Sequence, residues 1–337
     1  MALLGNRSRV LWVPLIWILV ASCAGSVKGG VRERIASIPA KNLKSYELKM
    51  QSHFTSRIQP APEFVIRYLR EVDGNETYST YHPSKEEIDL IDAYLSQLPP
   101  LHKRVLQDWL IGIYLVNDFQ GSGWADYVLD ESDNLYAILI FNPVVLKEGI
   151  SELLTRKENS CFIQDDPRLR VEIDCGKDFR GLMYILLHET SHIVDYLQGH
   201  TPYVEEEMRE LGKALQQVTP FVSGVWAGYA EPTTMYDFPF RKEVTFYGLN
   251  QGPRIRITDA MQVYEGLAKA PFVSLYGSMN WAEDFAEFIT FYHLTNKLGQ
   301  PYEVKLLQGN EGKLAHSPIK AKRVLERSRL VQAVYAE

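Results

Sequence analysis

Two histidines and a glutamate near the middle of the chain have the types and spacing of a metal-dependent hydrolytic site. They stand in the string His188-Glu189-Thr190-Ser191-His192. Residues four apart lie on one face of a helix, so the two imidazoles can point at a single ion. A glutamate beside them can take a proton from water that zinc has acidified. The string predicts one zinc ion per chain, with His188 and His192 as ligands and Glu189 as the general base.

The chain around this string has the pattern of a helix. Apolar residues recur at the helical period between Asp178 and Gly199. Aspartate commonly caps a helix N-terminus, and glycine commonly ends a helix. We therefore predict a helix over 178–199 that carries the motif in its middle. The alternative is a pair of histidines that stand four apart by chance.

A catalytic zinc ion needs a third protein ligand, and the residues just after His192 do not supply one. His200 falls beyond the predicted end of the helix. A carboxylate from a second helix is the other solution, and Glu283 and Glu287 share a helix face. We predict that Glu283 binds zinc and that Glu287 orients a ligating histidine. Asp284 as the ligand and a merely solvated acidic face remain the alternatives.

Read together, these strings resemble a known family. The pattern is similar to the catalytic domain of anthrax lethal factor and its relatives, which are gluzincin metallopeptidases. The likeness covers about residues 185–197 and 275–293, and the residues that carry it are His188, Glu189, His192, Val194, Asp195, Tyr276, Gly277, Asn280, Ala282, Glu283, Phe285, Ala286, Glu287 and His293.

The resemblance implies a zinc endopeptidase that acts on a protein or peptide. It implies that Tyr276 donates a hydrogen bond to the oxyanion and that Glu287 and Asp195 are supporting groups. A phenol stays protonated at neutral pH, which suits the role of Tyr276; a core tyrosine is the alternative. Glu283 follows His192 by 91 positions, more than in that family, so the family's substrates are not implied.

The expected fold is α+β and zincin-like, rich in helix, with a small sheet whose edge strand precedes the zinc helix. Ser84 and Glu87 form a capping box that opens a helical lead-in over about 84–116, with its second helix over about 101–116. Residues 135–141 are predicted as the edge strand, where an extended peptide could pair; a buried core strand is the alternative. Further helices are predicted over 204–218 and about 317–333, and the aromatic-rich stretch 201–275 is interpreted as core or as part of a cleft.

The N-terminus has the pattern of an export signal. Residues 1–22 combine two arginines with an apolar run too short for a comfortable membrane span. The string that ends in Cys23 resembles the lipobox of bacterial lipoproteins. It implies lipidation of Cys23, a tether over 23–40, and a metallopeptidase domain over 41–337 with its catalytic core at about 130–295. The expected location is the bacterial cell envelope, with the protein lipid-anchored in the outer membrane and facing the periplasm or the cell surface.

Cysteine usage and charge complete the sequence-based expectations. An exported chain favours a disulfide between Cys161 and Cys175; two free thiols are the alternative. The formal net charge is −6, and loss of the signal makes the chain more acidic, which argues against nucleic acid as a partner. The competing functions are a non-catalytic envelope lipoprotein on a peptidase scaffold and a hydrolase of cell-wall peptide bonds.

Overall fold

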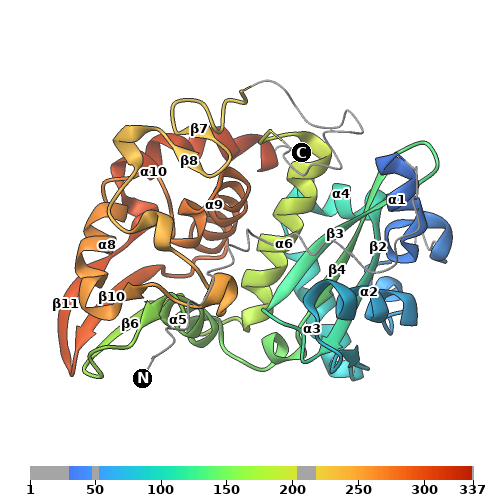
Figure 1. The fold of residues 1–337 in the computed structure, drawn as a ribbon, viewed down its shortest axis with the longest axis horizontal. Coiled ribbons are helices and arrows are strands. Elements are labelled where there is room, and N and C mark those ends of the chain that lie inside the picture. The colour runs from blue at the N-terminus through green and yellow to red at the C-terminus, as the bar shows by residue number, and fades with distance from the viewer. Residues whose placement is uncertain (1–29, 48–52, 203–217, 336–337) are drawn as a thin grey trace, which may run out of the picture.

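A long central helix separates a mixed sheet from the C-terminal part of the molecule (Figure 1). The computed structural model describes residues 30–47, 53–202 and 218–335. Helix and strand make up 48% and 19% of it. The two kinds of element alternate along the chain, but most strand pairs are antiparallel, which is consistent with the predicted α+β class. The central helix is α6 (Gly181–Gln198), with the sheet on one side and α9 (Trp281–Asn296) on the other.

The remaining elements have the following bounds. The other α-helices are α1 (Val31–Ser37), α2 (Glu63–Asp73), α3 (Lys85–Ser96), α4 (Pro100–Trp109), α5 (Ile150–Asn159), α8 (Ala260–Leu267) and α10 (Lys322–Arg327). The strands are β1 (Ser79–Thr80), β2 (Leu110–Asn117), β3 (Gly123–Leu129), β4 (Leu135–Phe141), β5 (Phe162–Ile163), β6 (Leu169–Asp174), β7 (Trp226–Gly228), β8 (Glu231–Pro232), β9 (Ile255–Arg256), β10 (Glu303–Gln308) and β11 (Glu311–His316).

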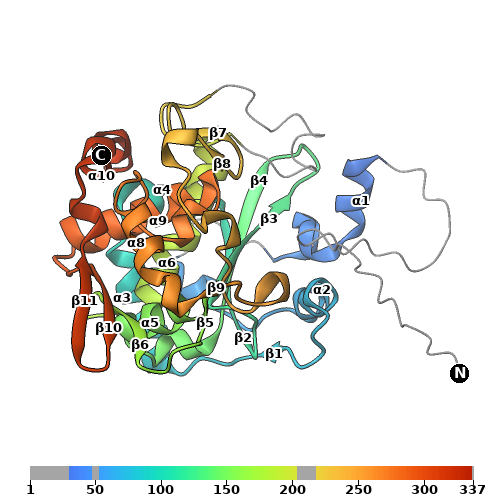
Figure 2. The ribbon, with the colours of Figure 1, turned by 60° about the vertical axis from the view of Figure 1, so that its left-hand side comes forward.

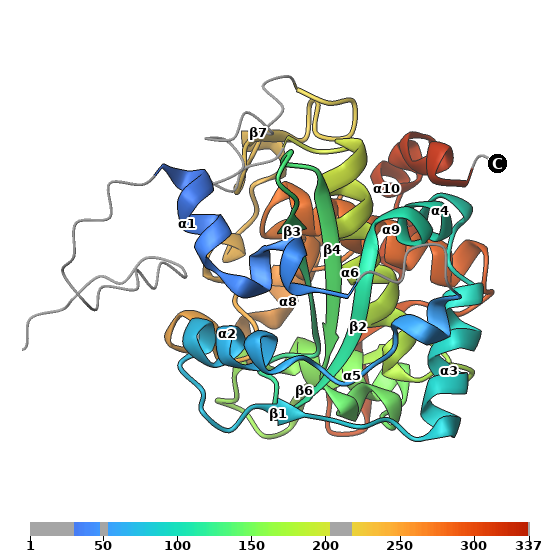
Figure 3. The ribbon, with the colours of Figure 1, turned by 90° about the vertical axis from the view of Figure 1, so that its right-hand side faces the viewer.

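The main sheet has the strand order β1-β2-β4-β3. β4 covers residues 135–141 as predicted, but it pairs with β2 on one side and β3 on the other. The prediction of an edge strand at 135–141 is therefore wrong, and the near-continuous apolar run reflects burial on both faces. The edge strand beside α6 is β3. Figure 3 shows α6 behind the sheet and α1 and α2 in front of it.

Close contact between β3 and α6 depends on the glycine at the start of the strand. A Cβ on Gly123 would collide with Ile185 Cγ2 on α6 and with Phe141 on β4. Only glycine lets the edge strand approach the helix this closely. The first turns of α6 and the start of β3 are thereby held side by side, which matters for the site described below.

The second predicted lead-in helix ends earlier than expected. The first helix, α3, begins after the Ser84 capping box, which is confirmed. α4 stops at Trp109, and residues 110–117 form β2 instead of continuing the helix to 116. β2 is buried on both faces, so its apolar residues do not alternate and also fit a helical period. The buried guanidinium of Arg57 donates to the carbonyl oxygens of Leu106, Gln107 and Leu110, which satisfies the end of α4.

A polar stripe on α5 covers the edge of β6. Ser151, Thr155 and Asn159 accept hydrogen bonds from the backbone N–H groups of Cys175, Ile173 and Val171, at 2.9, 2.9 and 3.1 Å. Four helical residues rise about 6 Å, and two strand residues rise about 6.6 Å, so the two spacings match. The sheet of order β11-β10-β6 therefore ends against a helix, at the side of the molecule remote from α1 (Figure 2).

The same packing rules out the predicted disulfide. Cys161 and Cys175 are both buried free thiols. Cys175 lies beside the first turn of α5, through Ser151, whereas Cys161 follows the last turn. Ten residues of helix span about 15 Å, and a disulfide needs Cα atoms within about 7 Å. The 14-residue spacing in the sequence does not show that a helix holds the two thiols apart.

The helix predicted over 178–199 is present, with a corrected start. α6 begins at Gly181, after an N-cap residue, Arg180, that makes no side-chain cap. The N–H of Gly181 is satisfied by the Glu148 carbonyl instead, and Asp178 accepts a hydrogen bond from Gln300. Gly199 ends the helix in the left-handed conformation at φ 66°, as predicted.

Both ends of the described chain differ from expectation. Residues 31–41, predicted to belong mostly to the tether, form α1 and a 3₁₀ helix over Pro39–Lys41, and they bury Ile35 and Ala40. The predicted helix over 317–333 is only a short α-helix, α10, followed by a 3₁₀ helix over Ser328–Tyr335. Val331 and Val334 are both buried, and their spacing of three matches the 3₁₀ period. Most of the predicted helix over 204–218 lies outside the described residues.

A buried glutamate on α5 makes the stability depend on pH. Glu158 accepts a hydrogen bond from the Tyr264 hydroxyl at 2.7 Å, and burial raises its pKa from 4.5 to about 7. The folded state favours the neutral form of this carboxyl group. Its contribution to the free energy of unfolding is therefore full below about pH 4.5 and is lost as the pH rises through 7. We expect Glu158→Gln to match the wild type near pH 4.5 and to exceed it by roughly 3 kcal/mol at pH 8.

Chemical denaturation of both proteins at the two pH values measures this difference. Glutamine keeps the acceptor for Tyr264 and removes only the charge. A difference in unfolding free energy that does not change between pH 4.5 and pH 8 would contradict the prediction.

Candidate metal centre

Three side chains from two packed helices converge on one point. α6 supplies His188 and His192, and α9 supplies Glu283. The two Nε2 atoms of the histidines lie 3.2 Å apart. Glu283 Oε2 lies 3.1 Å from His188 Nε2 and 3.5 Å from His192 Nε2. The structure therefore brings together the three residues that the sequence predicted as ligands.

The three donor atoms fit a tetrahedral cation. Ligands at about 2.0–2.1 Å on the corners of a tetrahedron lie about 3.3–3.4 Å from each other, close to the distances above. Glu283 Oε2 is buried and has no hydrogen-bond partner among the described residues. A buried carboxylate oxygen without a donor is costly, and a bound cation would satisfy it. This His188, His192 and Glu283 group could hold a metal ion.

The electrostatics of the group also favour a positive charge. Burial by itself lowers the pKa of His188, but the nearby carboxylates of Glu283 and Glu287 outweigh burial and raise the pKa to about 10. Burial raises the pKa of Glu283, yet His192 and His188 bring it below its usual range. A proton on His188 and a metal ion would meet the same demand of the two carboxylates for positive charge.

The third candidate ligand, Glu283, is placed by the start of α9. Asn280 caps this helix and accepts hydrogen bonds from the N–H groups of Ala282 and Glu283, both at 3.0 Å. Glu283 is therefore fixed in the first turn, where its side chain faces α6. Asp284, the alternative ligand, points elsewhere: it is fully buried and pairs with Arg327 at 2.8 Å and with Trp226 Nε1 at 2.9 Å. Asp284 ties α10 to α9 and takes no part in the centre.

Glu287 lies behind His188, as predicted. Its Oε1 is 3.0 Å from His188 Nδ1, so the carboxylate can set the orientation and tautomer of the ring. Ser274 donates to Oε2 at 2.5 Å, and the Tyr184 hydroxyl donates to Oε1. Burial raises the pKa of Glu287, but Lys157 and His188 lower it to about 2. Glu287 is a buried anion at neutral pH.

Three members of this network were not predicted from the sequence. Tyr184 stands one helical turn before His188, a spacing that could have been noticed. Ser274 and Lys157 come from distant segments and are brought in only by packing. The ammonium of Lys157 donates to the Tyr184 hydroxyl and lies 3.5 Å from Glu287 Oε1.

Asp195, which the family resemblance implies is a supporting group, makes its hydrogen bonds to Thr201. Its two carboxylate oxygens accept hydrogen bonds from the backbone and the hydroxyl of Thr201, at 2.6 and 2.5 Å. Among the described residues, no hydrogen bond reaches His192 Nδ1. Asp195 therefore fastens the chain just after α6, and any support of His192 is indirect. His200 stacks on Phe285 at 4.8 Å between ring centroids, away from the three donors.

The predicted base stands between the centre and the edge strand. Glu189 is 7% exposed, and its Oε2 accepts a hydrogen bond from the backbone N–H of Ala125 on β3 at 2.8 Å. This contact fixes the carboxylate on the side of α6 that faces the strand. It also occupies one N–H group of the edge strand, which is then not free to pair with a peptide.

Tyr276 lies on the other side of the centre. Its ring centroid is 5.6 Å from that of His188 and 5.2 Å from that of Phe246, which packs edge-on. Burial, together with the charge of Glu283, raises the pKa of the phenol well above its usual value. The hydroxyl therefore stays protonated and able to donate across the neutral range.

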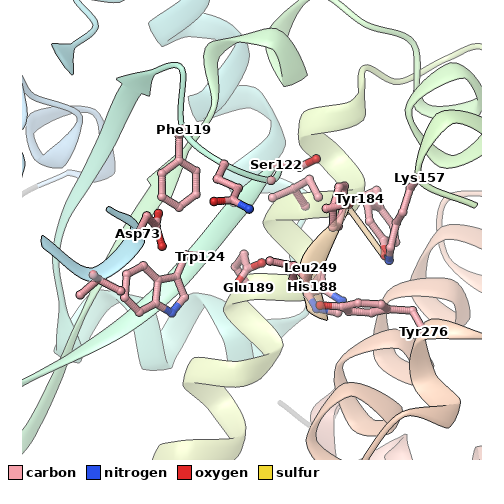
Figure 4. A pocket seen from close by; sticks show the side chains of 16 residues that line it. Asp73, Phe119, Ser122, Trp124, Lys157, Tyr184, His188, Glu189, Leu249 and Tyr276 are labelled. Atoms are coloured by element: carbon pink, nitrogen blue, oxygen red, sulfur yellow. The ribbon is translucent and has the colours of Figure 1, made fainter. Parts of the chain in front are cut away.

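A cavity of about 270 Å³ opens beside these groups. His188, Glu189 and Tyr276 line one end of it, and Phe119 and Trp124 line the other (Figure 4). The walls between are largely apolar. This shape could receive a side chain of a substrate next to the site of reaction.

Comparison with known proteins does not extend this description. No family model, curated protein or solved structure matches the chain. Among the described helices, none is both long and apolar enough to span a membrane.

Proposed function

We propose that this protein is a zinc-dependent endopeptidase of the gluzincin type with a zincin-like fold. The observation that carries the proposal is the triangle of donor atoms on α6 and α9, with Glu189 beside it and Tyr276 across from it. A binding site for metal alone requires neither a glutamate next to the first histidine nor a phenol at the cavity. The resemblance to the lethal factor family supports the same proposed function.

The chain's own residues supply the acid and base steps. When bound, zinc would acidify a water molecule and polarise the scissile carbonyl. Glu189 would take a proton from the attacking water and deliver it to the leaving amine, so that water is added across the C–N bond. Tyr276 would donate a hydrogen bond to the oxygen on which negative charge develops. The apolar cavity would hold the substrate beside these groups and exclude other water.

The test combines metal content with hydrolysis. Native mass spectrometry should find one zinc ion per folded chain, and a mixture of unstructured proteins should be cut in a manner that chelator abolishes and zinc restores. A folded chain that binds no zinc would instead favour a non-catalytic scaffold. Zinc binding with hydrolysis of cell-wall material alone would favour the cell-wall hydrolase.

Removal of the Tyr276 hydroxyl should slow the reaction without loss of metal. We expect Tyr276→Phe to lower kcat by about 10²–10³, because one donor to the oxyanion disappears. Zinc stoichiometry and KM should stay close to those of the wild type, since the ring remains in place. Steady-state kinetics on one fluorogenic peptide measure the effect, and an unchanged kcat would exclude Tyr276 from the chemistry.

The same proposal includes a lipid anchor at Cys23, which lies outside the described residues. Acyl chains on this cysteine would hold the protein on the outer membrane of a bacterial envelope. We expect the wild type to sediment with membranes and Cys23→Ala to become soluble or to remain unprocessed. Fractionation, with mass spectrometry of the N-terminal peptide, decides this, and a wild type without an acyl group would rule the anchor out.

A further inference from the structure

A lysine in the last turns of α5 reaches the inner wall of the candidate active site. Lys157 is 4% exposed, and it lines the cavity with His188, Glu189 and Tyr276. Figure 4 shows its side chain directed toward Tyr276 and Tyr184. Lysine is almost never buried without a partner, because its charge loses hydration. The groups around its ammonium therefore show which partners stabilise the buried charge.

The first partner is the carboxylate behind His188. Lys157 Nζ lies 3.5 Å from Glu287 Oε1 and donates to the hydroxyl of Tyr184, which in turn donates to the same oxygen. Ser274 holds the other oxygen of Glu287. Lys157 thereby balances the charge of the buried anion and completes the set of donors that fixes its orientation toward His188 Nδ1.

The second partner is the ring of Tyr276. Lys157 Nζ lies 3.8 Å from the centroid of this ring, within the range of a cation–π interaction. Phe246 packs edge-on against the same ring. Tyr276 belongs to a short 3₁₀ turn over Tyr276–Ser278, which by itself constrains the ring only weakly. The two contacts hold the phenol beside His188.

The ammonium group of Lys157 thus contacts two groups of the site: Glu287, which lies behind His188, and Tyr276, the proposed donor to the oxyanion. We propose that Lys157 is a positioning residue that sets the Glu287–His188 pair and the Tyr276 ring together. The inference rests on the proposed peptidase function for the part that concerns Tyr276. The part that concerns Glu287 and His188 requires only that the centre binds zinc.

A purely structural lysine provides a matched control. Lys41 is buried to a similar degree, at 6% exposed, and forms a buried ion pair with Asp126. Lys41→Met removes the same side chain from a comparable environment, but Lys41 touches none of the ligands, Glu287 or Tyr276. Loss of a buried charge alone should therefore affect both variants in stability and only the Lys157 variant in zinc binding and turnover.

The experiment compares Lys157→Met, Tyr276→Phe and the double variant with the wild type and Lys41→Met. The measurements are the zinc dissociation constant from chelator competition, and kcat and KM on one peptide. We expect Lys157→Met to weaken zinc binding about tenfold and to lower kcat about 10–100-fold with little change in KM. In the Tyr276→Phe background the same change should cost less than about threefold in kcat, because the hydroxyl it positions is gone.

The results separate the inference from the function it rests on. Normal zinc affinity and normal kcat in Lys157→Met would overturn the inference while leaving the peptidase intact. Fully additive losses of kcat in the double variant would overturn the part of the inference that concerns Tyr276. A wild type that binds zinc but cuts no peptide would overturn the proposed function. The zinc affinity of Lys157→Met would then still decide the role of Lys157 behind His188. If the methionine variant does not fold, Lys157→Gln keeps a donor without the cation and is held to the same outcomes.

Discussion

Glu189→Gln is expected to abolish peptide hydrolysis, with a loss in kcat of at least about 10³, while one zinc ion stays bound. Glutamine has nearly the shape of glutamate and can still accept the hydrogen bond from Ala125 N–H, but it cannot take a proton from water. Glu189 supplies none of the three donor atoms of His188, His192 and Glu283. The substitution by glutamine should therefore leave metal affinity almost unchanged. Native mass spectrometry and single-turnover kinetics on the same sample measure both quantities.

A glutamate far from the site supplies the control. Glu172 on β6 pairs with Arg170 at the surface, and Glu172→Gln should retain full turnover. Retained activity in Glu189→Gln would show that another group removes the proton, and the assignment of the base would fail. Loss of zinc in that variant would show instead that Glu189 takes part in binding the ion.

Glu283→Ala is expected to have the largest effect on the metal. It removes one of three protein ligands, so zinc affinity should fall by at least about 10² and hydrolysis should fall with it. The pKa of His188 should also fall from its raised value. Burial lowers this pKa, and the Glu283 carboxylate is the largest of the influences that raise it. Chelator competition measures the affinity, and NMR titration of the histidines in the metal-free protein measures the pKa.

The neighbouring carboxylate tests whether this effect is specific. Asp284→Asn disturbs the buried pair with Arg327 and should lower the free energy of unfolding, because a buried guanidinium loses its counter-charge. The folded fraction should nevertheless bind zinc normally. The opposite pattern, with normal zinc affinity in Glu283→Ala and loss in Asp284→Asn, would return the ligand role to Asp284.

Part of this site follows from local spacing. His188 and His192 share a face of any helix they lie in, and so do Glu283 and Glu287. The predicted helices around both pairs are present. The capping box at Ser84 and the helix end at Gly199 each involve only residues that are a few positions apart. Such features depend on hydrogen bonds between near neighbours, so the sequence alone can indicate them.

The remaining features arise from contacts between distant segments. The apolar residues over 110–116 fit the period of a helix. These residues nevertheless form β2, because strands on both sides supply hydrogen bonds. Residues 135–141 have the composition of a strand, but only the pairing of β3 shows that they lie inside the sheet. Cys161 and Cys175 are near in sequence, and α5 separates them.

The sequence by itself determined the types and helical spacing of the candidate ligands and the place of the proposed general base, because each is a property of residues within one or two turns. Only the tertiary structure decided that Glu283, and not Asp284, faces the histidines, since α6 and α9 must pack before either carboxylate has a direction. The same packing brought Lys157 and Ser274 to Glu287. A buried charge is stable only where partners from other segments surround it, and no pattern along the chain records which partners those are.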